Sequence, residues 1–591
     1  MTSICTIFLF AFLFLIGLSQ ADERGYDVID SWFEVTLNAP GGGYVIVTKD
    51  SLVHHYVTGV KDITTGEPVT RDTYFPIASV TKTLTSLLIH NLTLEGKCSW
   101  DSRIASILPF WECGDPIRSS MMTLQDLVYH RTGFGYGTGS LPSFTNPNLS
   151  LRDYVYSMKF FMPLAEFRAP SFLYNDAAFS LAGYIPEYIE DTSFRDLIQE
   201  RILNKLPSQP KGYYSLADLK ADDVDYSKGY MVDEETGEFY EPPQVVNEAL
   251  SHSSAPAGGL ALSLNGLAEF TQWFIPVINS SSYAPLTDMG NFPPFGTMLF
   301  GNSVVTPVGI GRGVFIYDVM GFRCYSHNGN AFGHTSLYVV CPDVDYGFAG
   351  LNNMYVADDN LMITAFLGLF QFLTGEVPPP EATEPLSTVS FKNKMGSYFK
   401  DGLSPKSTKI DRVFHVKESL QSSISLVDFN ETSWHHPFYG SLVVNFSDSI
   451  VDSEWRYNHL LLKLSHFHNN VYYADSAFDR ILVQFGRCPL TGKITSVKMF
   501  FVDENALFTS ENYLNEDMSF HPNDAATQDP RVVKFVEPAV YTNNMPIALI
   551  LGVVVGLIAS GVVGGLMFYF IRKSLNSFES YSFNPMSSNK V

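Results

Sequence analysis

The chain has 591 residues, and its 38 Lys and Arg stand against 61 Asp and Glu, for a formal net charge of −23. This acidity argues against a nucleic-acid partner, because affinity for phosphate backbones comes from clustered basic side chains. Apolar residues make up 46% of the chain, enough for ordinary globular packing. Since the length exceeds that of one compact core, we expect two folded domains with additional segments.

Residues 1–21 have the form of a signal peptide. An apolar run at 7–18 precedes Ser19-Gln20-Ala21, and small residues one and three positions before the cut suit signal peptidase. No Lys or Arg precedes the run, so an N-terminal membrane anchor is the alternative. The run is roughly 12 residues long, however, and a membrane span needs about 20. We therefore expect a cleaved signal and a secreted chain.

The predicted elements of residues 26–376 begin and end with strands. Alternating apolar residues predict a β-hairpin at 43–60, and apolar positions at helical spacing predict a helix at 79–92 with Ser79 at its N-cap. Similar patterns predict helices at 124–129, 177–189, 265–274 and 361–373, and strands at 313–317, 323–328, 336–341 and 347–352. Because the sheet then needs both ends of the segment, we predict an α+β domain with a helical insert between its two sets of strands.

Residues 377–389 are Pro-rich and predict a stiff linker to a smaller domain at 390–520. Strand-sized runs predict a small antiparallel sheet or barrel there, with strands at 440–446, 459–464, 471–474, 480–486 and 494–502. His466 and His468 lie two positions apart on one strand, where side chains point the same way. No third ligand is evident, so plain packing is favoured and we predict no metal site.

The C-terminal part predicts a membrane anchor. A polar, acidic stalk at 521–545 leads to an uncharged apolar run at 546–571, and Arg572 and Lys573 begin a tail at 572–591. Such a run spans a bilayer and leaves its basic flank in the cytoplasm. We expect a single-pass type I membrane protein whose domains are extracellular or lumenal, at the cell surface or in the secretory and endolysosomal pathway. Small residues recur every four positions in the run, which suits a homodimer face and a generic Gly-rich span equally.

A secreted chain predicts disulfides and glycans. Cys324 and Cys341 flank a predicted hairpin at equal distances from its turn, so cross-strand pairing would bring them to disulfide distance. Cys98 and Cys113 are the second predicted pair, and Cys488 is left single; buried thiols throughout are the alternative. Asn-X-Ser/Thr sequons predict glycans at Asn91, Asn148, Asn279, Asn430 and Asn445.

The strongest chemical signal begins with Ser79-Val80-Thr81-Lys82, an S-x-x-K pattern. Residues three apart share a helix face, so the Lys82 amine can reach the Ser79 hydroxyl and serve the base that a serine nucleophile requires. A helix N-terminus also offers free backbone N–H groups to a developing oxyanion. The pattern alone is weak, since Ser587-Ser588-Asn589-Lys590 repeats it in the tail.

Two further clusters give the pattern its context. Tyr174-Asn175-Asp176 begins a predicted helix, and His327-Asn328-Gly329 lies on a predicted strand. Taken separately, they would be interpreted as a buried aromatic with a helix cap and as a buried strand histidine.

With these clusters, over about residues 27–373, the chain resembles the serine β-lactamase and penicillin-binding-protein family, in particular its class C β-lactamase and esterase branch and its metazoan membrane members. The family's motifs S-x-x-K, Y-x-N and K-T-G or H-x-G have counterparts in the same order at 79–82, 174–176 and 327–329. The matching flanks are 73–78 before the serine, 124–133, the Ala-Gly-Gly-Leu at 257–260, Gly333 and Pro342. The small domain also resembles one appended to many of these hydrolases, through its Tyr-Gly-Ser-Leu at 439–442 and its Leu-Ser-His-Phe-His at 464–468.

The resemblance implies a role for each motif residue. Ser79 would form an acyl-enzyme, and Lys82 would help to remove its proton. Tyr174 would be the partner base and would activate the deacylating water. His327 would replace the family's strand lysine and contact the substrate carboxylate or Tyr174. The family needs no metal or cofactor.

The resemblance also implies an oxyanion hole and a pocket. The backbone N–H groups of Ser79 and Asn330 would bind the oxyanion, and Gly329 and Asp176 would line the pocket. Asp176 is a departure, because the family usually has Asn there, and an ionised carboxylate would favour protonated Lys82.

We therefore predict a membrane-anchored serine hydrolase that acts through an acyl-enzyme on an ester or amide. The substrate would be a small molecule or peptide, including ones that contain a D-amino acid or resemble β-lactams. The alternative is a cell-surface binding or structural protein that has kept the fold and lost turnover. A polymerising scaffold rests on family analogy alone.

Overall fold

The structure is a computed structural model that describes most of residues 23–376 and, in shorter stretches, residues 426–509. The predicted signal peptide, linker, stalk, apolar run and tail lie outside the described residues, as do Asn430 and Cys488. Within the described part of the chain, no helix is long and apolar enough to cross a bilayer.

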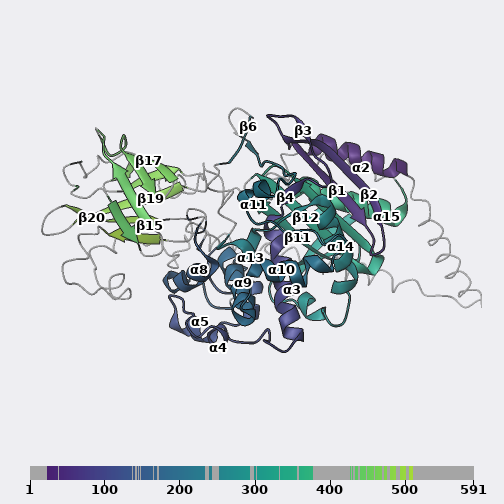
Figure 1. The fold of residues 1–591 in the computed structure, drawn as a ribbon, viewed down its shortest axis with the longest axis horizontal. Helices are drawn as coiled ribbons and strands as arrows, with labels where there is room; N and C mark the ends of the chain where they lie inside the picture. The colour runs from purple at the N-terminus through teal and green to yellow at the C-terminus, as the bar shows by residue number, and fades with distance from the viewer. Residues whose placement is uncertain are drawn as a thin grey trace, which may run out of the picture. The chain divides into compact units, whose positions relative to one another are not determined.

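An antiparallel sheet forms the centre of the larger domain (Figure 1). Its described strands follow the order β3-β2-β1-β13-β12-β11-β10-β9-β8. Their bounds are Gly41–Val47 (β1), Leu52–Asp62 (β2), Glu67–Pro68 (β3), Met298–Phe300 (β8), Ser303–Ile310 (β9), Phe315–Val319 (β10), Phe322–Ala331 (β11), His334–Cys341 (β12) and Tyr346–Asn352 (β13). Because β1 pairs with β13, the sheet joins both ends of the segment, as predicted.

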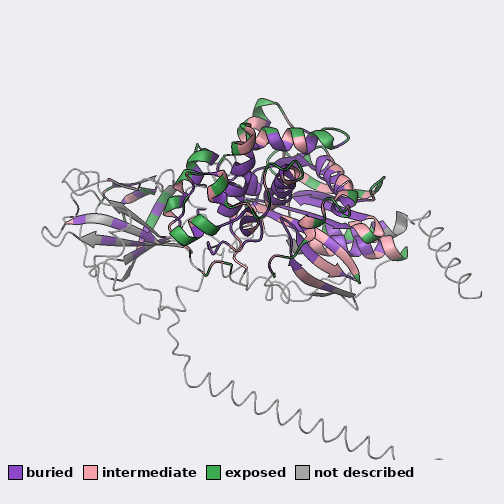
Figure 2. Cartoon of the chain, turned by 90° about the horizontal axis from the view of Figure 1, so that it is seen from below, coloured by how far each residue is buried: buried purple, intermediate pink, exposed green. Residues whose placement is uncertain are grey.

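The two faces of the sheet have separate cores. Tyr44 and Ile46 of β1 pack toward helices α2 (Glu23–Thr36) and α15 (Asp358–Thr374), whereas Val45 belongs to the cluster that contains α14 (Leu264–Ile278). This alternation follows from the pleat of a strand. Figure 2 shows the resulting buried layer between the helices.

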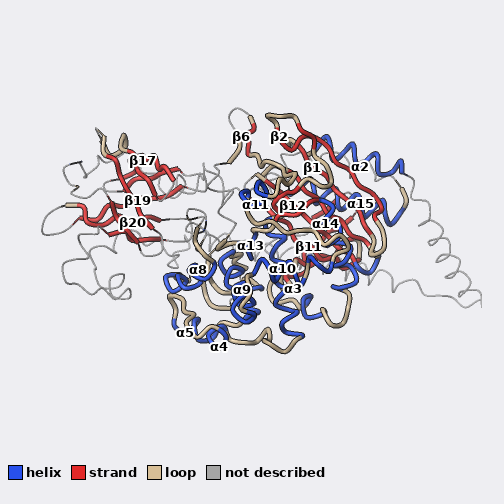
Figure 3. Tube along the Cα trace, in the orientation of Figure 1, coloured by secondary structure: helices blue, strands red, loops and turns tan. Residues whose placement is uncertain are grey.

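All five helices predicted from periodicity are present, as α3, α6, α9, α14 and α15, and the structure adds α2 and several short helices of the insert. The helices of the insert are α3 (Thr81–Leu94), α4 (Ile104–Ile107), α5 (Pro116–Met121), α6 (Leu124–Val128), α8 (Leu151–Ser157), α9 (Asp176–Glu190), α10 (Phe194–Arg201), α11 (Leu216–Ala221) and α13 (Ala255–Gly258). They lie apart from α2 and α15 in Figure 3. Helix α2 was not predicted, although Tyr26, Ile29 and Phe33, all buried, are spaced as one apolar face.

The smaller domain is a closed antiparallel barrel of the described strands β14 to β21. Their bounds are Ser433–His436, Gly440–Asn445, Glu454–Tyr457, Leu460–His468, Val471–Asp475, Arg480–Arg487, Ile494–Phe500 and Asn505–Thr509. The runs predicted as strands therefore do form strands. The pairing of β17 with β18 shifts register between His466 and His468, so the simple alternation assumed for these two positions is interrupted.

One predicted disulfide forms and the other does not. Cys324 on β11 and Cys341 on β12 are bonded, because the hairpin places them opposite one another. Cys98 and Cys113 are both free thiols, so the second predicted bridge is wrong. The Cys113 thiol instead lies in its own loop, 3.5 Å from the Asp115 carbonyl oxygen.

The described sequons differ in accessibility. Asn148, Asn279 and Asn445 are exposed, as an attached glycan requires. Asn91 is half-buried within α3, and its Oδ1 accepts a hydrogen bond from the Tyr283 hydroxyl at 2.8 Å. Asn91 is thus less accessible than the other three, and glycans at all four stay a prediction.

Candidate active site

Ser79 lies in a single 3₁₀ turn, η1 (Ala78–Val80), directly before α3. Ala78 has a φ of 44°, a left-handed conformation that is costly for residues other than glycine and concentrates at functional sites. The predicted N-cap role of Ser79 is wrong, because α3 begins at Thr81 and the Ser79 hydroxyl meets other side chains instead of capping the helix. Thr81 Oγ1 donates to the Ala78 carbonyl at 2.7 Å and closes the turn.

The Lys82 amine returns to Ser79 from the first turn of α3. Its Nζ lies 2.9 Å from Ser79 Oγ and donates to the Ala257 carbonyl at 2.7 Å. Ala257 reaches this place because the Ile77 N–H donates to the Leu260 carbonyl at 2.9 Å, which ties the Ala-Gly-Gly-Leu segment to the serine turn. The Lys82 side chain is completely buried, so its charge depends on these partners.

Tyr174 approaches Ser79 from the start of α9. Its hydroxyl donates to Ser79 Oγ at 2.8 Å. The next residue, Asn175, is the N-cap: its Oδ1 accepts from the Ala178 N–H at 2.9 Å, and its Nδ2 donates to the Gly135 carbonyl at 2.6 Å. The structure therefore brings Ser79, Lys82 and Tyr174 together, and Asn175 fixes the segment that carries the tyrosine.

Asp176 is the first residue of α9, where a carboxylate interacts favourably with the positive end of the helix dipole. Its Oδ1 is buried and lies 2.6 Å from Lys82 Nζ, as an ion pair without ordinary hydrogen-bond geometry. About a third of the Asp176 side chain is exposed. Burial lowers the pKa of the Lys82 amine, and the Asp176 charge opposes that change. The departure from the family's Asn therefore acts directly on the lysine.

His327 lies on β11 and is almost completely buried. Its Nδ1 donates to the Asn328 carbonyl at 2.6 Å, and its ring packs on Phe315 with 4.9 Å between centroids. Burial and then the charge of Lys82 lower the pKa of His327 to about 3. The imidazole is therefore neutral at physiological pH and does not supply the positive charge of the strand lysine that it replaces.

Gly329 lets β11 run directly against the serine turn. A Cβ on Gly329 would lie 2.2 Å from the Ile77 carbonyl oxygen and 3.0 Å from the Ser79 backbone nitrogen. Ser336, opposite Gly329 on β12, donates to the same Ile77 carbonyl at 2.6 Å. Asn330 follows on the strand, and its Oδ1 accepts from Thr335 Oγ1 at 2.9 Å. This close approach is what an oxyanion hole between the Ser79 and Asn330 amides requires; that role stays a prediction.

The structure adds His130, which the sequence showed only as part of a matching flank. Its ring stacks on Tyr174 with 4.4 Å between centroids. Burial, and then the charge of Lys82, lower the pKa of His130 well below its usual range. The described residues contain no group of side chains suited to hold a metal ion. The arrangement of hydroxyl, amine and phenol can instead activate a serine for acyl transfer.

Comparison with known proteins agrees with this geometry. The family model described as Beta-lactamase matches residues 29–363, more than half of the chain. Penicillin-binding protein 4 of Amycolatopsis lactamdurans is 23% identical over 62% of this chain and 94% of its own length. Unguisins hydrolase ungD of Aspergillus violaceofuscus is 22% identical over 56% of this chain, a match that spans 60% of that protein.

The fold also matches a solved structure. An octameric penicillin-binding protein homologue from Pyrococcus abyssi superposes with a TM-score of 0.51 at 17% identity, covering 82% of this chain and 98% of that one. At this identity the likeness concerns the fold alone. From the family model, the motifs and the site together, the chain belongs to the serine β-lactamase and penicillin-binding-protein family.

Proposed function

We propose that the protein is a serine hydrolase that cleaves an ester or amide through an acyl-enzyme on Ser79. The observation that carries this proposal is the convergence of Lys82 Nζ and the Tyr174 hydroxyl on Ser79 Oγ, at 2.9 and 2.8 Å. Both distances are those of a base within reach of the proton that it removes.

The chemistry follows from these contacts. Ser79 Oγ attacks the carbonyl carbon, and its proton passes to the Lys82–Tyr174 pair. The tetrahedral intermediate collapses as the leaving alcohol or amine takes a proton from the same pair. Water then gives a proton to Tyr174 as it attacks the acyl carbon. The bond from that carbon to Ser79 Oγ breaks, the acid leaves, and Ser79 Oγ takes the proton from Tyr174. The amides of Ser79 and Asn330 would stabilise the oxyanion in both steps.

The substrate proposal is a small ester or amide, including ones with a D-amino acid. The neutral His327 favours substrates without a carboxylate, because it offers no positive charge to bind one. A carboxylate-bearing β-lactam is correspondingly less favoured than a simple ester.

We also propose that the hydrolase faces the outside of the cell or an organelle lumen and is anchored through residues 546–571. The Cys324–Cys341 bond supports an oxidising compartment. The signal-like residues 1–21 and the exposed sequons support the same route.

A fluorescent fluorophosphonate tests the nucleophile on intact cells that express the full chain. We expect the wild type to be labelled, Ser79→Ala to lose labelling, and the labelled peptide to contain Ser79. Ser587→Ala is the matched control, because Ser587 begins the same four-residue pattern in the tail. Equal labelling of the wild type and Ser79→Ala would refute the proposal.

The competing function is a binding protein that has lost turnover, and the Asp176–Lys82 ion pair is the observation that favours it. Burst kinetics on a p-nitrophenyl ester decide between the two. A burst followed by steady turnover, both abolished in Ser79→Ala, establishes the enzyme. A wild type without burst or turnover, which still binds the ester, supports the binding protein.

A further inference from the structure

The proposed chemistry assigns no role to His130, whose imidazole lies directly behind Tyr174. The two ring planes meet at 26°, so this is a stacked contact. Phe172 and Phe179 enclose the imidazole further, with centroids 5.4 and 5.1 Å away. His130 is 3% exposed as a residue, so its imidazole lies under other side chains and away from a substrate.

His130 also holds the backbone on both sides of Tyr174. Its Nδ1 accepts a hydrogen bond from the Asn175 N–H at 3.1 Å, and its carbonyl accepts from the Leu173 N–H at 3.3 Å. Because an N–H is the donor, Nδ1 carries no proton, and the imidazole is the neutral tautomer protonated at Nε2. Protonation at Nδ1 would break the contact with Asn175.

The backbone of His130 is held in an unusual conformation. Its φ is 53°, in the left-handed region that residues other than glycine rarely adopt and that persists where the surroundings enforce it. The surroundings here are charged groups on neighbouring segments. Arg131 pairs with the buried Asp126 at 2.7 Å, and Arg118 donates to the Thr132 carbonyl at 2.7 Å. The loop is thereby fixed with its imidazole against Tyr174.

Burial, and then the charge of Lys82, keep His130 neutral. Asp176, the carboxylate that follows Asn175 in the chain, is already paired with Lys82. The imidazole therefore offers a fixed, uncharged surface across the working range of pH. A positioning role needs such a surface, because the ring and the hydrogen bond then do not change during proton transfer.

We propose that His130 is a positioning residue that fixes the ring and backbone of Tyr174 so that the tyrosine hydroxyl meets Ser79 Oγ. This inference rests on the proposed hydrolase function. Its physical basis is that proton transfer depends steeply on geometry, and a misplacement of about 1 Å can cost roughly 10²-fold in rate.

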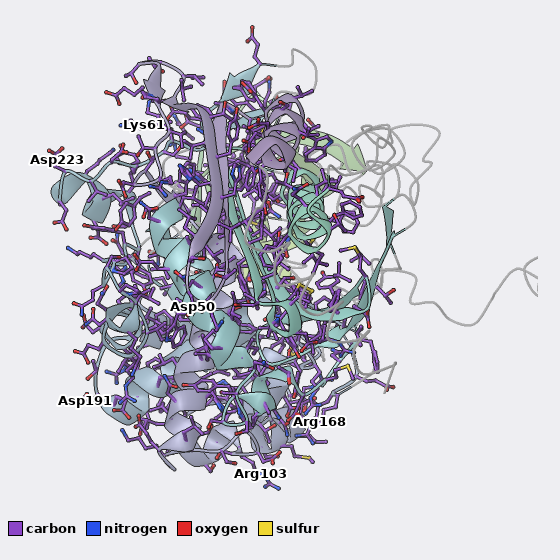
Figure 4. All side chains as sticks on the ribbon, turned by 90° about the vertical axis from the view of Figure 1, so that its right-hand side faces the viewer. Asp50, Lys61, Arg103, Arg168, Asp191 and Asp223 are labelled. Atoms are coloured by element: carbon purple, nitrogen blue, oxygen red, sulfur yellow. A yellow bond between two sulfur atoms is a disulfide. The ribbon has the colours of Figure 1, made fainter. Side chains whose placement is uncertain are left out.

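His130→Asn is the principal test, because Asn tolerates the left-handed region and can offer Oδ1 as an acceptor but has no ring to stack. We expect kcat on a p-nitrophenyl ester to fall about 10- to 100-fold, with KM within about twofold and the melting temperature nearly unchanged. Asp191→Asn is the matched control, since Asp191 has a φ of 49° at the far end of α9 and lies at the periphery in Figure 4. We expect that control to keep the wild-type rate.

A second measurement distinguishes positioning from general support of the fold. In a Tyr174→Phe background, whose slow reaction is followed by fluorophosphonate labelling, His130→Asn should change the rate less than about threefold, because the group that it positions is gone. If His130→Asn does not fold, His130→Gln serves in its place. A folded variant with wild-type kcat, or a full additional loss in the Tyr174→Phe background, overturns the inference.

Measurements on the wild type show whether the proposed function or only the His130 inference has failed. If it shows no Ser79-dependent labelling or turnover, the proposed function fails and the His130 role falls with it. If the wild type turns over and the folded His130 variants match it, only the His130 inference fails.

Discussion

Gly329→Ala is the substitution whose effect on the site follows most directly from the structure. The added Cβ would meet the Ile77 carbonyl oxygen at 2.2 Å and Ser336 Oγ at 2.4 Å. Ordinary contacts of a Cβ begin at 3.4 Å, so β11 and the serine turn must separate. Ser336 can rotate away, but the Ile77 carbonyl is backbone and cannot.

The size of the effect follows from that separation, which is about 1 Å. A displacement of this size costs roughly 10²-fold in rate, and loss of one oxyanion donor costs about 10²–10³-fold in kcat, or about 2.7–4 kcal/mol. Overpacking costs about 1–3 kcal/mol of folding free energy, within the stability of an ordinary domain. We therefore expect a folded protein whose kcat is reduced at least 100-fold.

The assay is steady-state hydrolysis of a p-nitrophenyl ester, with the rate of fluorophosphonate labelling and the melting temperature measured on the same samples. Gly258→Ala is the matched control, because its Cβ would contact Ala78 of the same turn at an ordinary 3.5 Å. We expect the control to keep most of the activity. A Gly329→Ala protein with wild-type kcat would show that this strand does not form the oxyanion hole.

Two further predictions concern the lysine and the disulfide. Asp176→Asn removes the charge that raises the pKa of Lys82, so burial lowers that pKa further. We therefore expect the acid limb of the kcat/KM profile to move to lower pH. Measured pH–rate profiles in which this limb stays or moves to higher pH would contradict the prediction. Replacing both Cys324 and Cys341 by Ala removes a bridge between positions 17 residues apart and should lower the free energy of unfolding, measured by denaturant titration, by about 3 kcal/mol. In the control Cys98→Ala, which changes a free thiol, reductant should destabilise the protein as much as it does the wild type. Equal stability with and without the bridge would count against the prediction.

The Asp176 carboxylate has opposite effects on the stability of the site and on its chemistry. The carboxylate supports the buried ammonium of Lys82, which would otherwise lack a charged partner among the contacts described here. In the proposed mechanism, the same support makes Lys82 a poorer base, so Tyr174 would carry more of the proton transfer. Asp176→Asn is therefore expected to trade stability of the site for a wider pH range of activity.

The amino-acid sequence by itself determined the features that are local. Periodicity placed the longest helices and the central strands, and the spacing of Ser79 and Lys82 correctly put the lysine amine within reach of the serine hydroxyl. The Cys324–Cys341 bond was also predictable, because a hairpin pairs positions at equal distances from its turn. Helix α2 carried a readable apolar face over Tyr26, Ile29 and Phe33, so it was available to the same kind of reasoning.

Only the tertiary structure decided the contacts that join distant segments. The contact of Lys82 with the Ala257 carbonyl depends on how the serine turn and α13 pack together. The place of His130 under Tyr174 depends on a loop fixed by ion pairs, and the separation of the Cys98 and Cys113 thiols depends on how their loop folds. These contacts form only when distant parts of the chain come together and are buried, and the spacing of neighbouring residues does not encode that.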